Sequence, residues 1–162
     1  METKLRRYRG SLVTNGGCII AFGLWSALKF VITFITDPDL FNYEINDHAE
    51  SSEYALILKI MTVIFVASII ALILYIHIYI GRSSYREGLS EKTGSFYLVI
   101  TFIVAVIVLF EMVLYLVPRD NIEETFISLL AAFFIDLTKE LLLVDTLYVA
   151  VMSRHLAKKL AK

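Results

Sequence analysis

Four ionisable side chains lie within residues 133–149, FFIDLTKELLLVDTLYV, a stretch that is otherwise almost wholly apolar. They are Asp136, Lys139, Glu140 and Asp145. A carboxylate held in apolar surroundings can bind a cation or exchange a proton, and ionisable groups inside a membrane are a default pointer to function. What these groups do therefore depends on whether the stretch crosses a membrane and on what faces its charges.

The composition indicates a membrane protein. Of the 162 residues, 58% are apolar and 19% are charged, against about 45–50% and about 25% in an ordinary soluble domain. The apolar residues fall into four blocks, each near or above the ~20 residues that cross a ~30 Å hydrocarbon core. The blocks run over residues 12–36, 54–80, 95–117 and 125–152, and none has an internal proline or strand-like alternation.

The fold class predicted from these blocks is all-α: a polytopic membrane protein with four transmembrane helices. Backbone groups in lipid must be hydrogen-bonded internally, so each block is expected to form a helix. The connections, residues 37–53, 81–94 and 118–124, are short, which predicts an up-and-down bundle whose successive helices are antiparallel neighbours. We therefore expect residues 1–162 to form a single four-helix transmembrane domain.

The basic residues predict how this domain is oriented. One group of segments collects Lys4, Arg6, Arg7, Arg9, Arg82, Arg86, Lys92, Arg154, Lys158, Lys159 and Lys162. The other two connections carry Arg119 alone, together with nine acidic residues. By the positive-inside rule, the basic N-terminus, the 81–94 loop and the basic C-terminal tail are predicted to be cytoplasmic. We expect a multi-pass protein of the cell (plasma or inner) membrane.

One face of the fourth block gathers most of its charges. At about 100° per residue, Asp136 and Lys139 share a stripe with small and hydroxylated residues, and Glu140 lies on its edge. In lipid, such a stripe is typical of a surface that faces other helices. The stripe comprises Thr125, Ser128, Ala132, Asp136, Lys139, Leu143, Thr146 and Ala150. Asp145 lies on the opposite face, where it could be protonated, pair with His77, or be buried against another membrane subunit or a second copy of the chain.

The other blocks offer charges of their own at a similar depth. Counting ~1.5 Å per residue from the span midpoints, Lys29 and Glu111 lie about 7 Å outward of the membrane centre. A charge at the centre costs about 2.5–3.5 kcal/mol, so mutual pairing is expected. We predict an intramembrane polar site made of Asp136, Lys139, Glu140, Glu111 and Lys29, in which Lys29 pairs with Glu111.

Three glycines in the first block, Gly16, Gly17 and Gly23, fall short of a GxxxG pattern. They nevertheless indicate a position where another helix could approach closely.

No motif of known chemistry occurs in the sequence. There is no HExxH, CxxC or GxSxG motif, no zinc-ligand spacing and no phosphate loop. We therefore predict no catalytic residue, no metal site and no cofactor, and we do not favour an enzyme. The chain has no basic domain that would bind nucleic acid. The expected partners are the lipid bilayer and other membrane subunits, or the chain itself.

Three functions remain open. The first is a non-enzymatic accessory or scaffold subunit of a membrane complex, in which buried charges form closed pairs that fix helix register. An alternative is a small transporter or channel, as a single chain or an oligomer, whose intramembrane carboxylates couple to protons or cations. A second alternative is a membrane enzyme that modifies a lipid, with Asp136 and Glu140 as its carboxylates.

Overall fold

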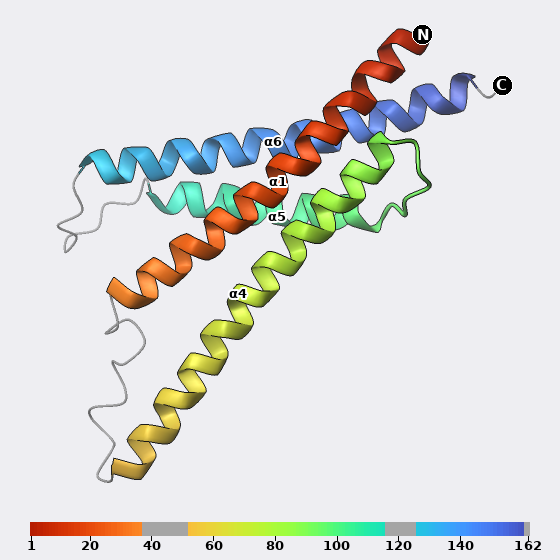
Figure 1. Ribbon diagram of the computed structural model, residues 1–162. Helices are drawn as coiled ribbons and strands as arrows, with labels where there is room; N and C mark the ends of the chain where they lie inside the picture. Colours follow the sequence, from red (N-terminus) through yellow and green to blue (C-terminus); the bar gives the residue numbers. More distant parts are fainter. Residues whose placement is uncertain (37–51, 116–125, 161–162) are drawn as a thin grey trace. The chain divides into compact units, whose positions relative to one another are not determined.

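The computed structural model describes residues 1–36, 52–115 and 126–160, and its regular structure there is all helical (Figure 1). The helices are α1 (Glu2–Thr36), α4 (Ser52–Gly88), α5 (Phe96–Tyr115) and α6 (Phe126–Leu160). Helices α1, α4 and α5 are long and apolar enough to cross a membrane. The all-helical class and the presence of membrane-competent helices therefore confirm this part of the prediction.

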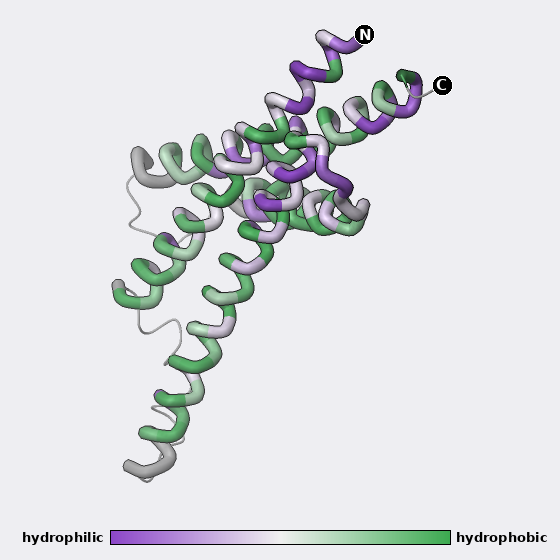
Figure 2. Tube along the Cα trace, turned by 45° about the vertical axis from the view of Figure 1, so that its right-hand side comes forward, coloured by the Kyte–Doolittle hydropathy of each residue, from purple (hydrophilic) through white to green (hydrophobic). Residues whose placement is uncertain are grey.

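Helix α6 differs from these three helices in its charge. Its apolar stretch is interrupted by Asp136, Lys139 and Glu140, and it is not among the helices apolar enough to span by composition alone in the described residues. Figure 2 shows the contrast, with hydrophobic residues along most of α4 and hydrophilic ones gathered at the N-terminal end of α1 and the C-terminal end of α6.

The helices extend beyond the apolar blocks. Helix α1 begins at Glu2 because the residues before the first block, such as Glu, Lys, Leu and Arg, are good helix formers. Helix α4 continues to Gly88 and takes up the first part of the predicted 81–94 loop. The apolar pattern marks where lipid can lie, whereas the helix ends are decided by local propensity and capping.

Helix α4 ends in a Schellman motif. Ser90 has a φ of 72°, and its N–H donates to the carbonyl of Glu87 at 3.0 Å. The N–H of Glu91 donates to the carbonyl of Arg86, also at 3.0 Å. These are the two bonds by which the motif satisfies the last carbonyls of a helix. Glycine is the usual residue at the left-handed position, so serine there is an unexpected choice.

The described chain divides into two compact units. The first consists of Met1–Ile20 and Ile78–Lys162, and the second of Ala21–His77. Helices α1 and α4 contribute to both units. The first unit therefore holds the basic ends of α1, α4 and α6, together with the whole of α5.

In the first unit, α1 and α4 approach to backbone contact. A Cβ added at Gly16 would lie 2.5 Å from the carbonyl oxygen of Gly81 and 2.9 Å from the nitrogen of Tyr85. One added at Gly88 would lie 2.7 Å from the carbonyl oxygen of Arg9. Both positions require glycine because a side chain there would meet backbone that cannot move aside. The close helix approach indicated by the glycines is thus present at Gly16.

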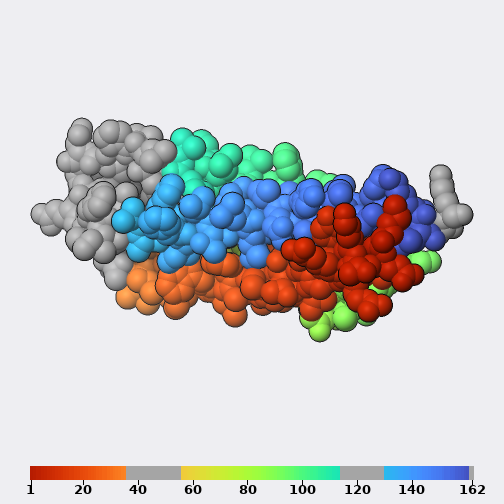
Figure 3. All heavy atoms as spheres, turned by 90° about the horizontal axis from the view of Figure 1, so that it is seen from above, coloured from red at the N-terminus to blue at the C-terminus, as the bar shows by residue number. Residues whose placement is uncertain are grey.

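The same unit has its apolar core between α1 and α6. Leu12, Val149 and Ala150 are buried together, and the rings of Tyr8 and Tyr148 meet edge to face at 6.3 Å. In Figure 3 the N-terminal turns of α1, in red, lie against the C-terminal half of α6, in blue. Helix α6 also packs along α5. Helix α6 is thus held by two neighbours.

In the second unit, α4 contacts α1 through another glycine. A Cβ at Gly23 would lie 2.4 Å from the Cβ of His77, a buried residue whose Nδ1 lies 2.8 Å from the carbonyl oxygen of Ile73. The preceding turns of α4 expose large apolar side chains: Leu56, Ile57, Leu58, Ile60, Met61, Val63, Ile64 and Phe65. A surface of this size and composition requires lipid or another apolar partner.

Adjacent glycines allow a controlled test of the α1–α4 contact. We expect Gly16→Ala to lower the free energy of unfolding by about 1–3 kcal/mol, since the methyl group would overlap the Gly81 carbonyl. Gly17→Ala is the matched control because nothing lies within 4 Å of its Cβ position. This control should be neutral or stabilising by up to about 1 kcal/mol. Thermal unfolding in detergent measures both, and equal effects would contradict the close contact.

Candidate functional site

The structure buries the charged stripe of α6. Asp136 and Lys139 are both buried, and so are Leu143, Thr146 and Ala150 farther along the same face. The surface of α6 that meets the other helices therefore includes two charged side chains. Of the remaining stripe positions, Ala132 is half-buried, whereas Thr125 and the side chain of Ser128 lie outside the described residues.

Glu140 and Asp145 differ from this pair in their surroundings. Glu140 is half-buried, and its Oε2 is buried without a hydrogen-bond partner in the described part of the chain. Asp145 is exposed, and its Oδ2 accepts a 2.8 Å hydrogen bond from Nδ2 of Asn15. Asn15 is buried on α1, so this bond links α1 to α6. Nothing in the spacing of the sequence pointed to Asn15 as the partner of Asp145.

The other two predicted site residues lie apart along the chain. Glu111 is exposed on α5 in the first unit, and Lys29 is exposed on α1 in the second. The pairing of Lys29 with Glu111 stays a prediction. Of the predicted site, the structure thus brings together Asp136, Lys139 and Glu140 on one helix.

A charged cluster that the sequence analysis missed lies at the end of α4. The carboxylate of Glu87, only 8% exposed, accepts bonds from Nε and Nη2 of Arg154 at 2.7 and 2.6 Å. This two-pronged geometry is the strongest arrangement of an arginine and a carboxylate. Tyr97 and Thr93 each donate a further hydroxyl bond to Glu87 at 2.8 Å. One carboxylate thus joins α4, the α4–α5 turn, α5 and α6.

Arg154 is itself committed to this cluster. Its Nη1 donates to Oγ of Ser95 at 2.6 Å, its Nη2 also reaches the carbonyl of Gly94 at 3.4 Å, and its guanidinium lies 5.8 Å from the centre of the Tyr97 ring. The hydrogen bonds that Arg154 donates to Glu87 raise the pKa of Arg154 above its already high value, so the guanidinium stays charged. The groups of this cluster are therefore engaged with one another, and they tie the helices together.

The sequence held only a faint signal for this cluster. Glu87 is one of few acidic residues in segments that otherwise collect lysine and arginine. An acid among many bases suggests an ion pair, but nothing in the sequence distinguishes Arg154 from the other bases as its partner.

Metal chemistry gains no support from the described residues. Nowhere in residues 1–36, 52–115 and 126–160 do three or more His, Cys, Asp or Glu side chains gather in a way that could hold a metal ion. Cys18 is a free, half-buried thiol on α1.

The comparisons with known proteins give no relative: no family model, no curated protein and no solved structure matches the chain. The class of protein is therefore defined by its helices alone. It is an all-helical protein with helices long and apolar enough to cross a membrane.

The Glu87–Arg154 pair yields a stability prediction. Arg154→Met leaves a buried carboxylate with only its hydroxyl donors, so we expect the free energy of unfolding to fall by about 2–4 kcal/mol. Arg154→Lys should recover only part of the loss because an ammonium cannot form the two-pronged contact. Unfolding in detergent, followed by helix content, measures these changes.

The control for this prediction is a second ion pair in the same region. Arg86 and Glu91 pair with side chains about half exposed, 50% and 47%. Arg86→Met should cost no more than about 1 kcal/mol, as is usual for surface pairs. If both arginine substitutions cost the same, the burial of Glu87 is not what makes its pair important.

Proposed function

We propose that the chain is a multi-pass membrane protein in which α6 crosses the bilayer together with α1, α4 and α5. The apolar length of the other three helices supports a membrane location. Burial of Asp136 and Lys139 supports a spanning α6, since charges in a membrane helix are tolerated where they face the bundle interior. Together these helices would form one up-and-down bundle.

The proposed orientation has both termini and the α4–α5 turn in the cytoplasm. The excess of lysine and arginine in these segments supports it. So does their proximity, because Glu2 of α1, Ser90 of the turn and Leu160 of α6 line one pocket in the first unit. Segments that meet in this way lie on the same side of a membrane.

Within the membrane, we propose a non-catalytic role as an accessory or scaffold subunit of a larger complex. The observation that carries this proposal is the closed Glu87 cluster. Four hydrogen bonds occupy the carboxylate, so Glu87 cannot bind a substrate or exchange a proton without separating helices. The exposed apolar turns of α4 give such a subunit a surface for its neighbours.

A second candidate is a small transporter that couples to protons or cations. It is favoured by Glu140, whose Oε2 is buried without a hydrogen-bond partner among the described residues, on the helix that also buries Asp136. A carboxylate in such a position can exchange a proton when water reaches it. This candidate would use the α6 charges in place of the Glu87 cluster.

Thiol labelling tests the orientation. In a Cys18→Ser background, Asp47→Cys and Asn121→Cys should react with an impermeant maleimide added to intact cells. Ser90→Cys should react only after the membrane is opened, because the turn is proposed to face the cytoplasm. Labelling of Ser90→Cys in intact cells would overturn the orientation.

Flux through liposomes separates the scaffold from the transporter. For a scaffold, the purified chain should move no more protons or monovalent cations than protein-free vesicles, as read by a pH-sensitive dye, and Glu140→Gln should change nothing. A transporter would give flux that Glu140→Gln abolishes. Asp145→Asn is the matched control, since Asp145 lies on the opposite face of α6 and can keep its bond from Asn15. Flux that survives the control but not Glu140→Gln would replace the scaffold proposal.

A further inference from the structure

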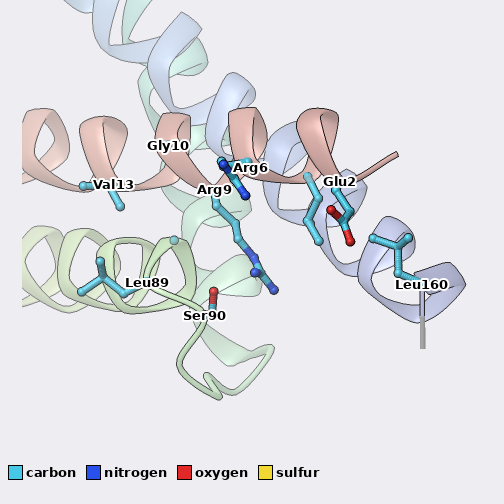
Figure 4. A pocket seen from close by; sticks show the side chains of 10 residues that line it. Glu2, Arg6, Arg9, Gly10, Val13, Leu89, Ser90 and Leu160 are labelled. Carbon is cyan, nitrogen blue, oxygen red and sulfur yellow. The ribbon is translucent and has the colours of Figure 1, made fainter.

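A pocket of about 660 Å³ lies where the first turns of α1 meet the end of α4 and the end of α6 (Figure 4). All of its described lining belongs to the first unit. Its volume is within the ~300–1,000 Å³ of pockets that take small molecules. The pocket lies at the basic ends of α1 and α4, which are long and apolar enough to cross a membrane.

Two arginines line this pocket from one side of α1. Arg6 and Arg9 are three residues apart, so they are neighbours on the helix surface. Figure 4 shows Arg9 reaching from α1 towards Ser90 at the end of α4. Unlike Arg154, neither guanidinium forms a hydrogen bond or an ion pair within the described parts of the chain. Both are therefore available to an anion.

One acidic residue lines the pocket together with the two arginines. Glu2 also lines the pocket, but it is exposed, and no ion pair joins it to either arginine within the described residues. The lining thus has two cations against one anion. Its net charge favours an anionic ligand, and arginine favours phosphate because its planar fork matches two phosphate oxygens.

The pocket is also lined by large apolar side chains that remain partly exposed to water. Leu89 and Leu160 remain 53% and 42% exposed, and Leu5 and Val13 are half-buried. A small soluble anion would use the arginines but leave these leucines in water. A ligand with a phosphate at one end and hydrocarbon at the other would satisfy both parts of the pocket.

We propose that this pocket binds one anionic phospholipid, with Arg6 and Arg9 holding the phosphate and the leucines contacting the glycerol and upper acyl chains. Basic pockets between membrane helices on the cytoplasmic side are a recurring form of lipid recognition. The proposal rests on the membrane location and orientation given above, but it goes beyond the scaffold role and holds equally for a transporter. The lipid would bridge α1, α4 and α6 at the pocket.

Native mass spectrometry of the purified full chain tests this proposal. Phosphatidylglycerol and phosphatidylcholine with identical acyl chains are titrated in turn into the detergent-solubilised protein. We expect one phosphatidylglycerol to bind at least about tenfold more tightly than phosphatidylcholine, the factor that corresponds to about 1.4 kcal/mol. Arg6→Gln together with Arg9→Gln should remove this preference. Equal binding of the two lipids to the unmodified chain would overturn the proposal.

Arg7→Gln is the matched control. Arg7 has the same charge, lies between the two pocket arginines in sequence and is exposed as Arg6 is, but it does not line the pocket. It should leave the preference for phosphatidylglycerol within about twofold of the unmodified chain, because charges outside the pocket act only weakly through water. If Arg7→Gln weakens binding as much as the double substitution, general surface charge explains the result and the pocket does not.

Two further measurements distinguish a phospholipid from a soluble phosphate or an acidic peptide as the ligand. Leu89→Asn keeps both arginines, and it should weaken phosphatidylglycerol binding several-fold by removing apolar contact. Glycerol 3-phosphate and inorganic phosphate at millimolar concentration should not displace the lipid, and neither should a poly-glutamate peptide. Displacement by either small anion would assign the site to a soluble phosphate, and displacement by the peptide would assign it to an acidic protein segment. Either result would overturn the proposal that the ligand is a phospholipid. Because binding is measured on the isolated chain, it fails or succeeds independently of the labelling and flux experiments.

Discussion

The burial of the Glu87 carboxylate is the constraint on which the first unit depends. A charged group removed from water loses several kcal/mol of hydration, and this loss is offset only if every acceptor position is filled with good geometry. Glu87 achieves this with donors from three places in the chain: Arg154 on α6, Tyr97 on α5 and Thr93 in the turn. Those elements must therefore be in place together. The carboxylate makes their arrangement cooperative, because displacing any one of them leaves it incompletely satisfied.

The contact between α1 and α4 has a different physical basis. Lipid tails are as apolar as leucine side chains, so hydrophobicity does not draw two membrane helices together, and close packing must do it. Gly16, Gly81 and Gly88 allow the backbones to touch, and Ser84 adds a 3.0 Å hydrogen bond to the carbonyl of Leu12. Helix α6, by contrast, is tied to its neighbours by polar bonds such as that from Asn15 to Asp145. Close backbone contact at glycines thus holds α1 to α4, whereas α6 is held to α1 by an apolar cluster and by a directed polar contact.

Composition and periodicity predicted much of this architecture. Long apolar blocks without proline can satisfy their backbone in lipid only as helices, and a 3.6-residue repeat separates the buried face of α6, with Asp136 and Lys139, from the face of Asp145. Counting residues along a helix gives depth, but it does not say which neighbouring helix a side chain meets. For that reason the Asn15–Asp145 and Glu87–Arg154 contacts were missed. Each joins residues far apart in the sequence, and several chemically equivalent candidates existed for each partner.

The end of α4 contacts two helices, α1 and α6, through consecutive residues. Gly88 lies against the α1 backbone, and the adjacent Glu87 accepts from α6, so consecutive residues serve contacts about 100° apart around one helix. Removing or adding a single residue between Gly81 and Glu87 would rotate Glu87 and Gly88 together by about 100° relative to the preceding part of α4. Both contacts would then be lost. Substitution at an exposed position in between, such as Arg82, disturbs neither contact through the backbone. Over evolutionary time the exposed positions of this segment should therefore accept changes of side chain while its length stays invariant, because the length sets the spacing between the two contacts.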